Sequence, residues 1–450
     1  MRDAGRIERW TIVLLAVTAL LLPEAVAAVA RPRAIMILPF DATALDPEYR
    51  WIGEGVAELV RLGLAQHPAF AQLGDVRQRV SGPEVWGEAA VARSIRTLRA
   101  DAALFGEVSR SGTDLVIQPR LMEVTRAGIE AAALEPITVP ESEQLLRLLA
   151  PLAGIYARTL RNNLTDAETR RMETAAQPTR SLKAFELYAR AQVVTSHRPG
   201  QEGQEQAADL LGRAIEVDPT FAVAHHALGL VHQALGNRWK ATAQFRASTH
   251  LEPSYPEPYK SLGDLLLTAP RPSYDQAIEA YEKAIHFRPF YADAHVGLGD
   301  ARAAKGDVDG AIGAYTAALT HNPINPRVHV SLGKVYYAEK NLYYEAVTAY
   351  KKAIDLDPRS VEARMGLGEV YEDKGLYQEA ADQYRRVIEL DGTHTGATYN
   401  LALVYEKTDP REAIVQWERY LALAAQLPSE KDWVDVARQH LRKLKNQLKQ

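Results

Sequence analysis

The chain of 450 residues contains no cysteine. This absence excludes disulfide bonds, thiol catalysis, zinc or iron–sulfur sites built from cysteine, and a lipidated cysteine at the start of a mature chain. An excess of positive charge is lacking as well, because the formal net charge is −4 and the isoelectric point is about 6.3. A chain with this balance has no general attraction for phosphate backbones, so we expect no nucleic acid partner.

Catalytic signatures are lacking too. The sequence has no Gly-x-Ser-x-Gly elbow and no His-Glu-x-x-His helix. Gly53-Glu54-Gly55 begins like a dinucleotide-binding loop, but the third glycine of that motif is missing and Val56 begins an amphipathic helix. Acidic residues are plentiful, yet no marked pair stands out for acid–base work. We therefore expect no enzyme activity, no cofactor and no metal.

The first thirty residues are predicted to be an export signal. Three arginines precede an apolar run over 10–22, and two small-x-small cleavage choices follow at 25–27 and 28–30. This order is typical of a secretory signal peptide. The apolar run is short for a membrane span, so we expect cleavage, with a retained anchor as the alternative.

From residue 228 onward the sequence contains a repeat. A leucine followed by glycine or alanine recurs at steps of 34 to 36 residues, an alanine follows, and an aromatic residue stands four positions beyond that alanine. The leucines are Leu228, Leu262, Leu298, Leu332, Leu367 and Leu401, and the aromatic residues are Phe245, Tyr281, Tyr315, Tyr350, Tyr384 and Trp417. Small residues let two helices approach closely, whereas bulkier ones would cost about 1–3 kcal/mol by overpacking. Prolines close successive units, because proline cannot donate the next helical hydrogen bond.

This pattern resembles the tetratricopeptide repeat, whose 34-residue unit carries Leu-Gly-x-x-Tyr, then Ala-x-x-x-Phe, then proline. The resemblance implies an all-α solenoid, a right-handed superhelix of helical hairpins, over residues 181–423. Six units are clear and a more divergent one, with Ala207 and Leu211 in its second helix, precedes them, so we expect about seven hairpins. The resemblance also implies that the array binds other proteins.

Residues 429–450 are predicted to form a capping helix after the array. Ser429 can cap its amino end. Its apolar residues lie roughly on one face: Trp433, Val436, Leu441, Leu444 and Leu448. Such a face would seal the solenoid, because a terminal repeat must be covered.

The resemblance implies that the second, fifth, ninth and twelfth positions of each first helix face a ligand groove. By that resemblance, the second positions of four central units are Glu257, Asp293, Arg327 and Glu362, and the ninth positions are Asp264, Asp300, Lys334 and Glu369; Lys260 occupies a fifth position. Six of these first eight residues are acidic, which favours a partner protein with a segment rich in Lys or Arg. The alternative is a solvated helix face without a ligand. A clamp for a carboxylate tail is not expected, since the fifth positions are mostly apolar or aromatic.

Three histidines, His225, His226 and His232, stand close together in the sequence. Two of them, His225 and His232, occupy repeat positions normally filled by packing aromatic residues. We therefore expect packing histidines rather than metal ligands.

Residues 31–165 follow a different pattern. Short apolar runs indicate strands over 34–40, 103–108 and 115–121, the last two joined by a turn at Ser111-Gly112, and leucine-rich periodic stretches indicate helices over 52–64 and 141–160. The sequence therefore predicts a small α/β domain, followed by a linker over 166–180.

Three segments of this domain, 37–40, 51–55 and 105–108, resemble the amino-terminal domain of TolB-like proteins, which often precedes such repeats. The resemblance covers about 130 residues. In TolB itself a β-propeller follows and the partners belong to the Tol–Pal system. No propeller-like repeat is visible here, so a Tol–Pal role is not carried over.

The leading hypothesis is an exported, non-enzymatic interaction scaffold of the bacterial cell envelope that binds partner proteins through the repeat groove. The alternative is an envelope sensor, whose α/β domain binds a small ligand and signals through the repeats. Membrane contact is expected only if the signal is retained as an anchor.

Overall fold

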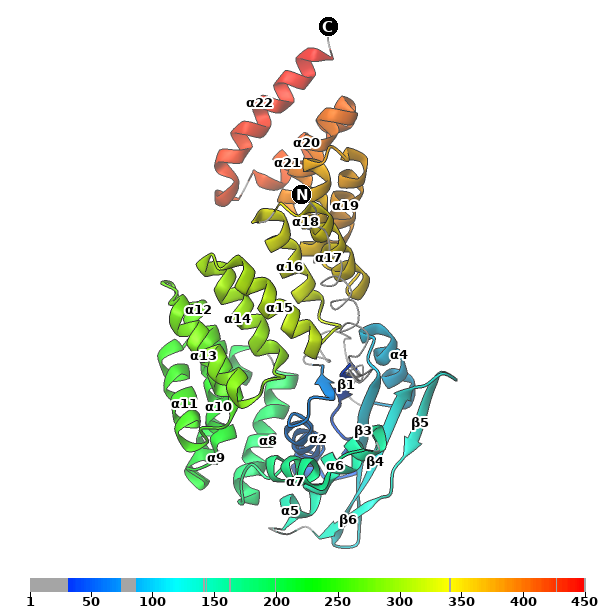
Figure 1. The fold of residues 1–450 in the computed structure, drawn as a ribbon, viewed down its shortest axis with the longest axis vertical. Helices are drawn as coiled ribbons and strands as arrows, with labels where there is room; N and C mark the ends of the chain where they lie inside the picture. Colours follow the sequence, from blue (N-terminus) through cyan, green and yellow to red (C-terminus); the bar gives the residue numbers. More distant parts are fainter. Residues whose placement is uncertain are drawn as a thin grey trace, which may run out of the picture. The chain divides into compact units, whose positions relative to one another are not determined.

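The computed structural model describes residues 31–448, apart from 74–85, 141, 143, 162, 199, 340 and 426. The predicted export signal over residues 1–30 lies outside the described residues. Within them, a mixed α/β sheet region is followed by helical repeats (Figure 1). The predicted fold class is confirmed.

In its described residues, the α/β domain contains a six-stranded sheet. Its strands are β1 (Arg33–Ile37), β2 (Phe70–Gln72), β3 (Ala102–Ser111), β4 (Asp114–Val124), β5 (Ile129–Ala133) and β6 (Ile137–Pro140). They lie in the order β2-β1-β3-β4-β5, and β6 pairs with β4. Strand β1 is parallel to both of its neighbours, which explains its almost uninterrupted apolar sequence. The β3–β4 hairpin turns at Gly112, whose φ of 62° lies in the region that favours glycine.

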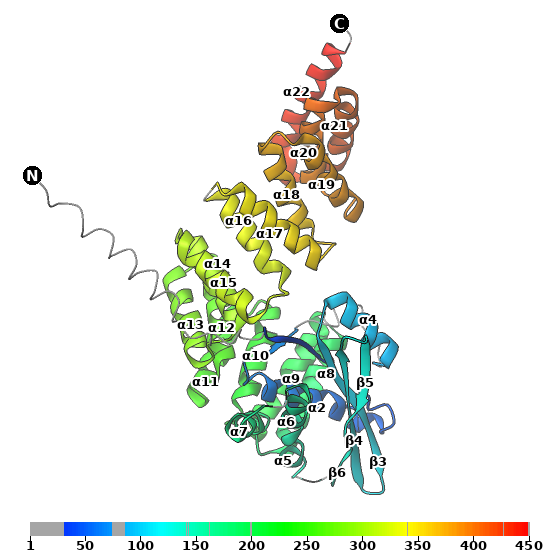
Figure 2. The same cartoon turned by 45° about the vertical axis from the view of Figure 1, so that its right-hand side comes forward.

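Helices cover both faces of this sheet. They are α2 (Trp51–Leu64), α4 (Glu88–Leu98), α5 (Leu145–Leu149), α6 (Pro151–Leu160) and α7 (Asp166–Ala175), with a 3₁₀ turn η2 (Pro47–Tyr49) before α2. Alternate residues of β1 enter different cores: Ile35 and Ile37 pack with α2, α5 and α6, whereas Ala34 and Met36 pack with α4. The domain therefore has three layers, with the sheet in the middle (Figures 1 and 2).

Two predictions for this region are wrong. The single helix expected over 141–160 is two helices in its described part, α5 and α6, because Pro151 begins a new helix. The stretch expected to be a linker, 166–180, contains α7. Thr165 and Glu168 form a reciprocal capping box at its start, and Met172, which is fully buried, packs in the core with α2 and α6.

Seven helix pairs occupy the described residues between 182 and 424 (Figure 2). The pairs are α8 (Leu182–His197) and α9 (Gln201–Val217), α10 (Ala222–Ala234) and α11 (Arg238–Leu251), α12 (Pro256–Leu267) and α13 (Tyr274–Phe287), α14 (Ala292–Lys305) and α15 (Val308–His321), α16 (Pro326–Ala338) and α17 (Tyr343–Leu356), α18 (Val361–Asp373) and α19 (Tyr377–Leu390), and α20 (Thr395–Thr408) and α21 (Pro410–Ala424). The two helices of each pair pack against each other, and each pair packs against the next.

Close approach between glycine and aromatic residues sets the spacing of the stack. A Cβ atom added to Gly299 would lie 2.5 Å from the ring of Tyr315, and one added to Gly368 would lie 2.5 Å from the ring of Tyr384. Neither position has room for a side chain. The repeated Leu-Gly step therefore allows the aromatic residue of the second helix to lie against the backbone of the first.

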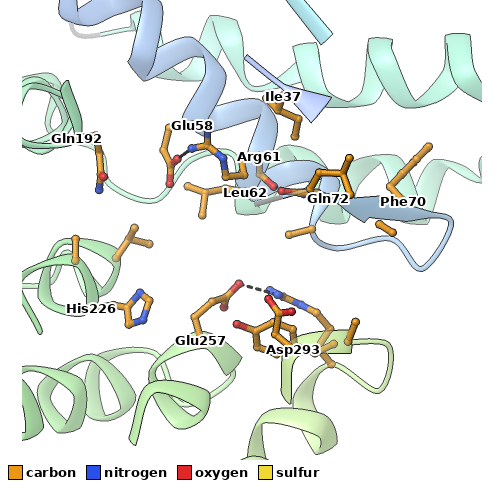
Figure 3. A pocket seen from close by; sticks show the side chains of 18 of the residues that line it. Ile37, Glu58, Arg61, Leu62, Phe70, Gln72, Gln192, His226, Glu257 and Asp293 are labelled. Atoms are coloured by element: carbon orange, nitrogen blue, oxygen red, sulfur yellow. Dashed lines mark hydrogen bonds and ion pairs between the residues drawn. The ribbon is translucent and has the colours of Figure 1, made fainter. Parts of the chain in front are cut away.

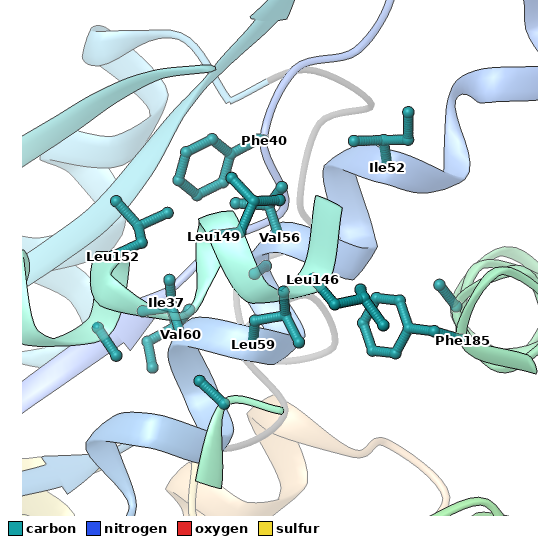
Figure 4. Packing of buried hydrophobic residues seen from close by; sticks show 14 of the residues in the cluster. Ile37, Phe40, Ile52, Val56, Leu59, Val60, Leu146, Leu149, Leu152 and Phe185 are labelled. Carbon is teal, nitrogen blue, oxygen red and sulfur yellow. The ribbon is translucent and has the colours of Figure 1, made fainter. Parts of the chain in front are cut away.

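The α/β domain and the first helix pairs share one hydrophobic core. A single cluster runs from Ile35 in β1 through α2 to Phe185 in α8 and Leu228 in α10. Figure 4 shows Phe185 beside Leu146 and Leu59 at this junction. The glycines that resembled a nucleotide loop serve this packing: Gly55 lies against the Phe185 ring, and Gly53 lies against the backbone of Phe40.

The carboxy-terminal helix α22 (Lys431–Gln447) packs against α21 through Val434, Ala437 and Leu444. The prediction that Ser429 caps the amino end of this helix is wrong. Ser429 lies within the 3₁₀ turn η3 (Pro428–Glu430), and no side chain caps α22. Glu430 instead ties this turn to the array, accepting hydrogen bonds from Thr395 (2.9 Å) and Tyr420 (2.7 Å).

Candidate protein-binding groove

The nine residues predicted to face a groove all lie on first helices of the pairs. Helix α12 carries Glu257, Lys260 and Asp264; α14 carries Asp293 and Asp300; α16 carries Arg327 and Lys334; α18 carries Glu362 and Glu369. The surface that these residues form is called the groove face below.

Most charges on the groove face are paired with each other. Asp264 accepts from Lys260 at 2.7 Å, and Asp300 lies 2.5 Å from the guanidinium of Arg327. Lys334 pairs with Glu362 one repeat further on. Internal pairing therefore neutralises much of the acidity that the composition of these positions suggested.

A second-helix hydroxyl holds several of these acids. Tyr281 donates to Asp264 and Tyr315 donates to Asp300, both at 2.8 Å. Tyr384 donates to Glu372 at 3.0 Å in the same way. The aromatic residue of each such pair thus fills the space between helices with its ring and fixes a carboxylate with its polar tip. The sequence analysis treated Asp264 and Asp300 as ligand contacts. The tyrosine that replaces phenylalanine at the aromatic position of these repeats was the signal that a hydroxyl could bond to them.

The α/β domain covers the first helices at the amino-terminal end of the array. Tyr188 of α8 donates to Glu58 of α2 at 2.6 Å, and the rings of Phe185 and Trp51 meet edge-on with centroids 6.4 Å apart. Further along, Arg99 at the end of α4 forms two bonds to the Asp355 carboxylate in α17, at 2.8 and 2.9 Å.

A cavity of about 870 Å³ lies where α2 faces the first helices. Its walls come from α2, from the β1 and β2 ends, and from α8, α10, α12 and α14. Figure 3 shows Glu58 and Arg61 on one side of this cavity, and His226, Glu257 and Asp293 on the other. Glu257 pairs with Arg288 at 2.6 Å, and both side chains are largely buried.

A protein-family model for the tetratricopeptide repeat matches residues 273–327, 296–343 and 332–395. The helix pairs within these residues are tetratricopeptide repeats. Such repeats generally serve as non-catalytic scaffolds for protein interaction, so the array has the architecture of a binding surface. No curated protein matches the sequence.

Several solved structures are similar to this chain, among them the tetratricopeptide-repeat protein YrrB. YrrB, described as having an unusual peptide-binding site, is 23% identical with a TM-score of 0.35, and the match covers 41% of this chain and 93% of YrrB. PilW, described as a type IV pilus biogenesis factor, is 18% identical with a TM-score of 0.41, covering 45% of this chain and 92% of PilW. PilF from Pseudomonas aeruginosa is 18% identical with a TM-score of 0.43, and the match covers 51% of this chain and 98% of PilF. Similarities at this level say nothing about function.

Two neighbouring carboxyls stand out electrostatically in the sixth tetratricopeptide repeat. Burial raises the pKa of Glu369, and the nearby Glu372 raises it further. Burial likewise raises the pKa of Glu372, although the hydroxyl of Tyr384 partly opposes this shift. Burial therefore disfavours the charged form of both carboxyls. Sequence reasoning singled out Glu369 and missed Glu372, which lies three residues further along the same helix.

The histidines of the second repeat make local contacts. His225 bonds to Gln244 at 2.7 Å, and His226 bonds to Ser261 at 3.0 Å while its ring lies against Phe245. Within the described ranges, no cluster of three or more His, Asp or Glu is placed to hold a metal ion. None of the helices in the described part of the chain combines the length and apolar character needed to cross a bilayer.

Proposed function

We propose that the protein is an exported, non-enzymatic scaffold of the bacterial cell envelope that binds a partner protein on the carboxy-terminal half of its groove face. The observation that carries this proposal is the pair Glu369 and Glu372. The two carboxyls lie three residues apart on α18, both are half-buried, and burial raises the pKa of each, so a Lys or Arg side chain of a partner would be held there favourably.

The position of the α/β domain supports this half of the array as the binding surface. That domain packs over α8 and faces α10, α12 and α14 across the cavity. Glu362 of the groove face lies on α18 and is exposed, and the fifth positions of α18 and α20 carry Met365 and Tyr399, both partly exposed. An acidic surface with an aromatic and a thioether side chain suits a basic segment with apolar anchors.

Cross-linking in cells tests the partner. We expect envelope cross-linking to recover a partner with the wild-type protein and to lose it with the double variant E369Q/E372Q. The matched control is E282Q. Glu282 is an exposed carboxylate on the second helix α13, where it pairs with Arg302. Equal recovery by all three proteins would reject this surface.

Export is tested separately by fractionating cells that express the protein with a carboxy-terminal tag. We expect a periplasmic or envelope-associated product, shortened by about thirty residues if the signal is cleaved. A full-length product in the cytosol would refute export, but it would leave the proposed binding surface untested.

The cavity favours a second candidate function. A space between the α/β domain and the repeats is a place where a small ligand would contact both, as a sensor requires. For this function the α/β domain, whose TolB-like character is part of the proposal, detects a ligand and the repeats report it. A ligand that binds only the folded state raises the melting temperature, so a thermal-shift screen tests the sensor.

A further inference from the structure

The cavity beside α2 has a chemical character of its own. We propose that it binds a small organic cation with N–H donors, an alkylammonium or guanidinium group, held between α2 and the first helices of repeats two to four. This inference rests on the sensor function given above as the second candidate, and it names the class of ligand.

The charge of the lining is the first argument. Four carboxylates line the cavity, those of Glu54, Glu58, Glu257 and Asp293, against the two guanidinium groups of Arg61 and Arg288. The two lining histidines do not offset this excess. Burial and the nearby Lys260 lower the pKa of His226 to about 3, and burial together with His295 lowers the pKa of His321. The described lining therefore has two more acidic than basic side chains.

Both guanidinium groups already have partners, which argues against an anionic ligand. Arg61 pairs with Glu58 and lies 3.9 Å from Glu54. Arg288 pairs with Glu257 and lies over the ring of Tyr291, 5.1 Å from its centroid. An incoming anion would have to break these pairs and would meet the remaining carboxylates.

Two acceptor atoms in the lining lack partners. Glu257 Oε2 and Asn322 Oδ1 are both buried and neither receives a hydrogen bond within the described structure. Both residues belong to the cavity wall. A buried acceptor without a donor is destabilising, so a ligand N–H toward which either side chain turned would supply the missing hydrogen bond.

Size and aromatic content agree with this ligand class. The volume of about 870 Å³ lies within the range of small-molecule sites. Tyr188, Tyr255 and Tyr291 also belong to the lining, and aromatic side chains attract organic cations. Inorganic cations would gain less from such walls than an amine with an apolar chain.

Isothermal titration calorimetry of the full chain tests the proposal. The probes are agmatine, which has both cationic groups, putrescine, its neutral isostere 1,4-butanediol, and an acetylated Lys-Arg-Lys peptide. We expect saturable binding of agmatine and at least tenfold weaker binding of 1,4-butanediol. E257Q should weaken agmatine binding about tenfold, the change typical of losing one charge-assisted contact.

The repeat supplies a matched control, because Glu362 occupies the same repeat position as Glu257 outside the cavity and is also ion-paired. E362Q should leave agmatine binding unchanged. D293N changes an exposed residue of the same wall and should weaken binding without loss of folding, which guards against a destabilised E257Q variant.

Other outcomes separate the possibilities. Peptide binding that is lost in E257Q, with agmatine inactive, would support the same cation site with a partner's side chain as its source. Equal binding of 1,4-butanediol and putrescine would overturn the cation and leave a sensor for neutral ligands. No saturable binding of any probe, or equal loss in E362Q, would overturn the site while leaving the scaffold untouched.

Discussion

The first two repeats and the last two repeats have the same local architecture but different surroundings. In the first, helix α8 buries Phe185 and Tyr188 against the α/β domain and shares its core. In the last, α18 and α20 pack mainly against other repeats and are followed by α22, within the part of the chain that the structure describes. One repeat sequence pattern thus builds both a structural junction and an open surface, and the residues on the first helix decide which.

The largest effect is expected from breaking the junction. Phe185 is 1% exposed and packs against Trp51 and the α5 and α2 leucines. F185A should cost about 3–5 kcal/mol of unfolding free energy through the cavity it leaves. Hydrogen exchange followed by mass spectrometry should then show α2 and α8 losing protection together. Loss confined to α8 would mean that the two regions fold independently.

A large but local effect is expected from overpacking a late repeat. G368L would place a side chain where the Tyr384 ring lies 2.5 Å from the position of the new Cβ atom, at a typical cost of about 1–3 kcal/mol. Because each repeat contacts its neighbours, exchange should increase in α18 to α21. The α/β domain should keep its protection. G313L, a substitution in α15 where an added Cβ meets no atom within 4 Å, is the control.

A smaller effect is expected from removing one tyrosine hydroxyl. Y384F takes away the donor to Glu372 and should cost about 0.5–1.5 kcal/mol in urea unfolding. The second repeat already has phenylalanine at this position, Phe245, so the ring alone satisfies the packing. A neutral result for Y384F would show that solvent replaces the hydroxyl at this surface.

The smallest effect is expected for E369Q, and its sign depends on pH. The pKa of Glu369 is raised in the folded state, so the folded state holds the proton more tightly than the unfolded state. Stability therefore falls as pH rises from the ordinary glutamate pKa through the raised one. Glutamine removes this loss, and the melting temperature of E369Q relative to wild type should rise between about pH 4 and pH 7. A constant difference across that interval would contradict the burial of this carboxyl.

Local patterns predicted the local structure well. The spacing of Leu228, Gly229 and Phe245, repeated along the chain, specified helix pairs because each residue type answers a packing need within one unit. What could not be predicted was the contact between distant segments. Glu58 and Tyr188 are 130 residues apart, and nothing in either periodicity says that they meet. The two aromatic residues Phe185 and Tyr188 on a first helix were the only sign of this contact in the sequence.

The groove prediction shows the same division. The positions of Asp264 and Asp300 on first helices followed from the repeat, and the structure places them there. Their hydrogen bonds to Tyr281 and Tyr315 depend on side-chain reach across a helix pair, which a one-dimensional pattern does not state. Whether the nine residues contact a partner stays a prediction.

The bond between Arg99 and Asp355 joins residues 256 positions apart. Nearby, Ile324 packs against the core beneath α4. The same α/β domain therefore contacts the array at two places, at its first helix and again at the fifth repeat. Between these points the α/β domain bridges the helix pairs, whereas beyond Asp355 each pair packs on its neighbours and α21 packs on α22. We therefore expect a pulling force on the carboxy terminus to separate the last repeats first, and these are the repeats proposed above to bind a partner.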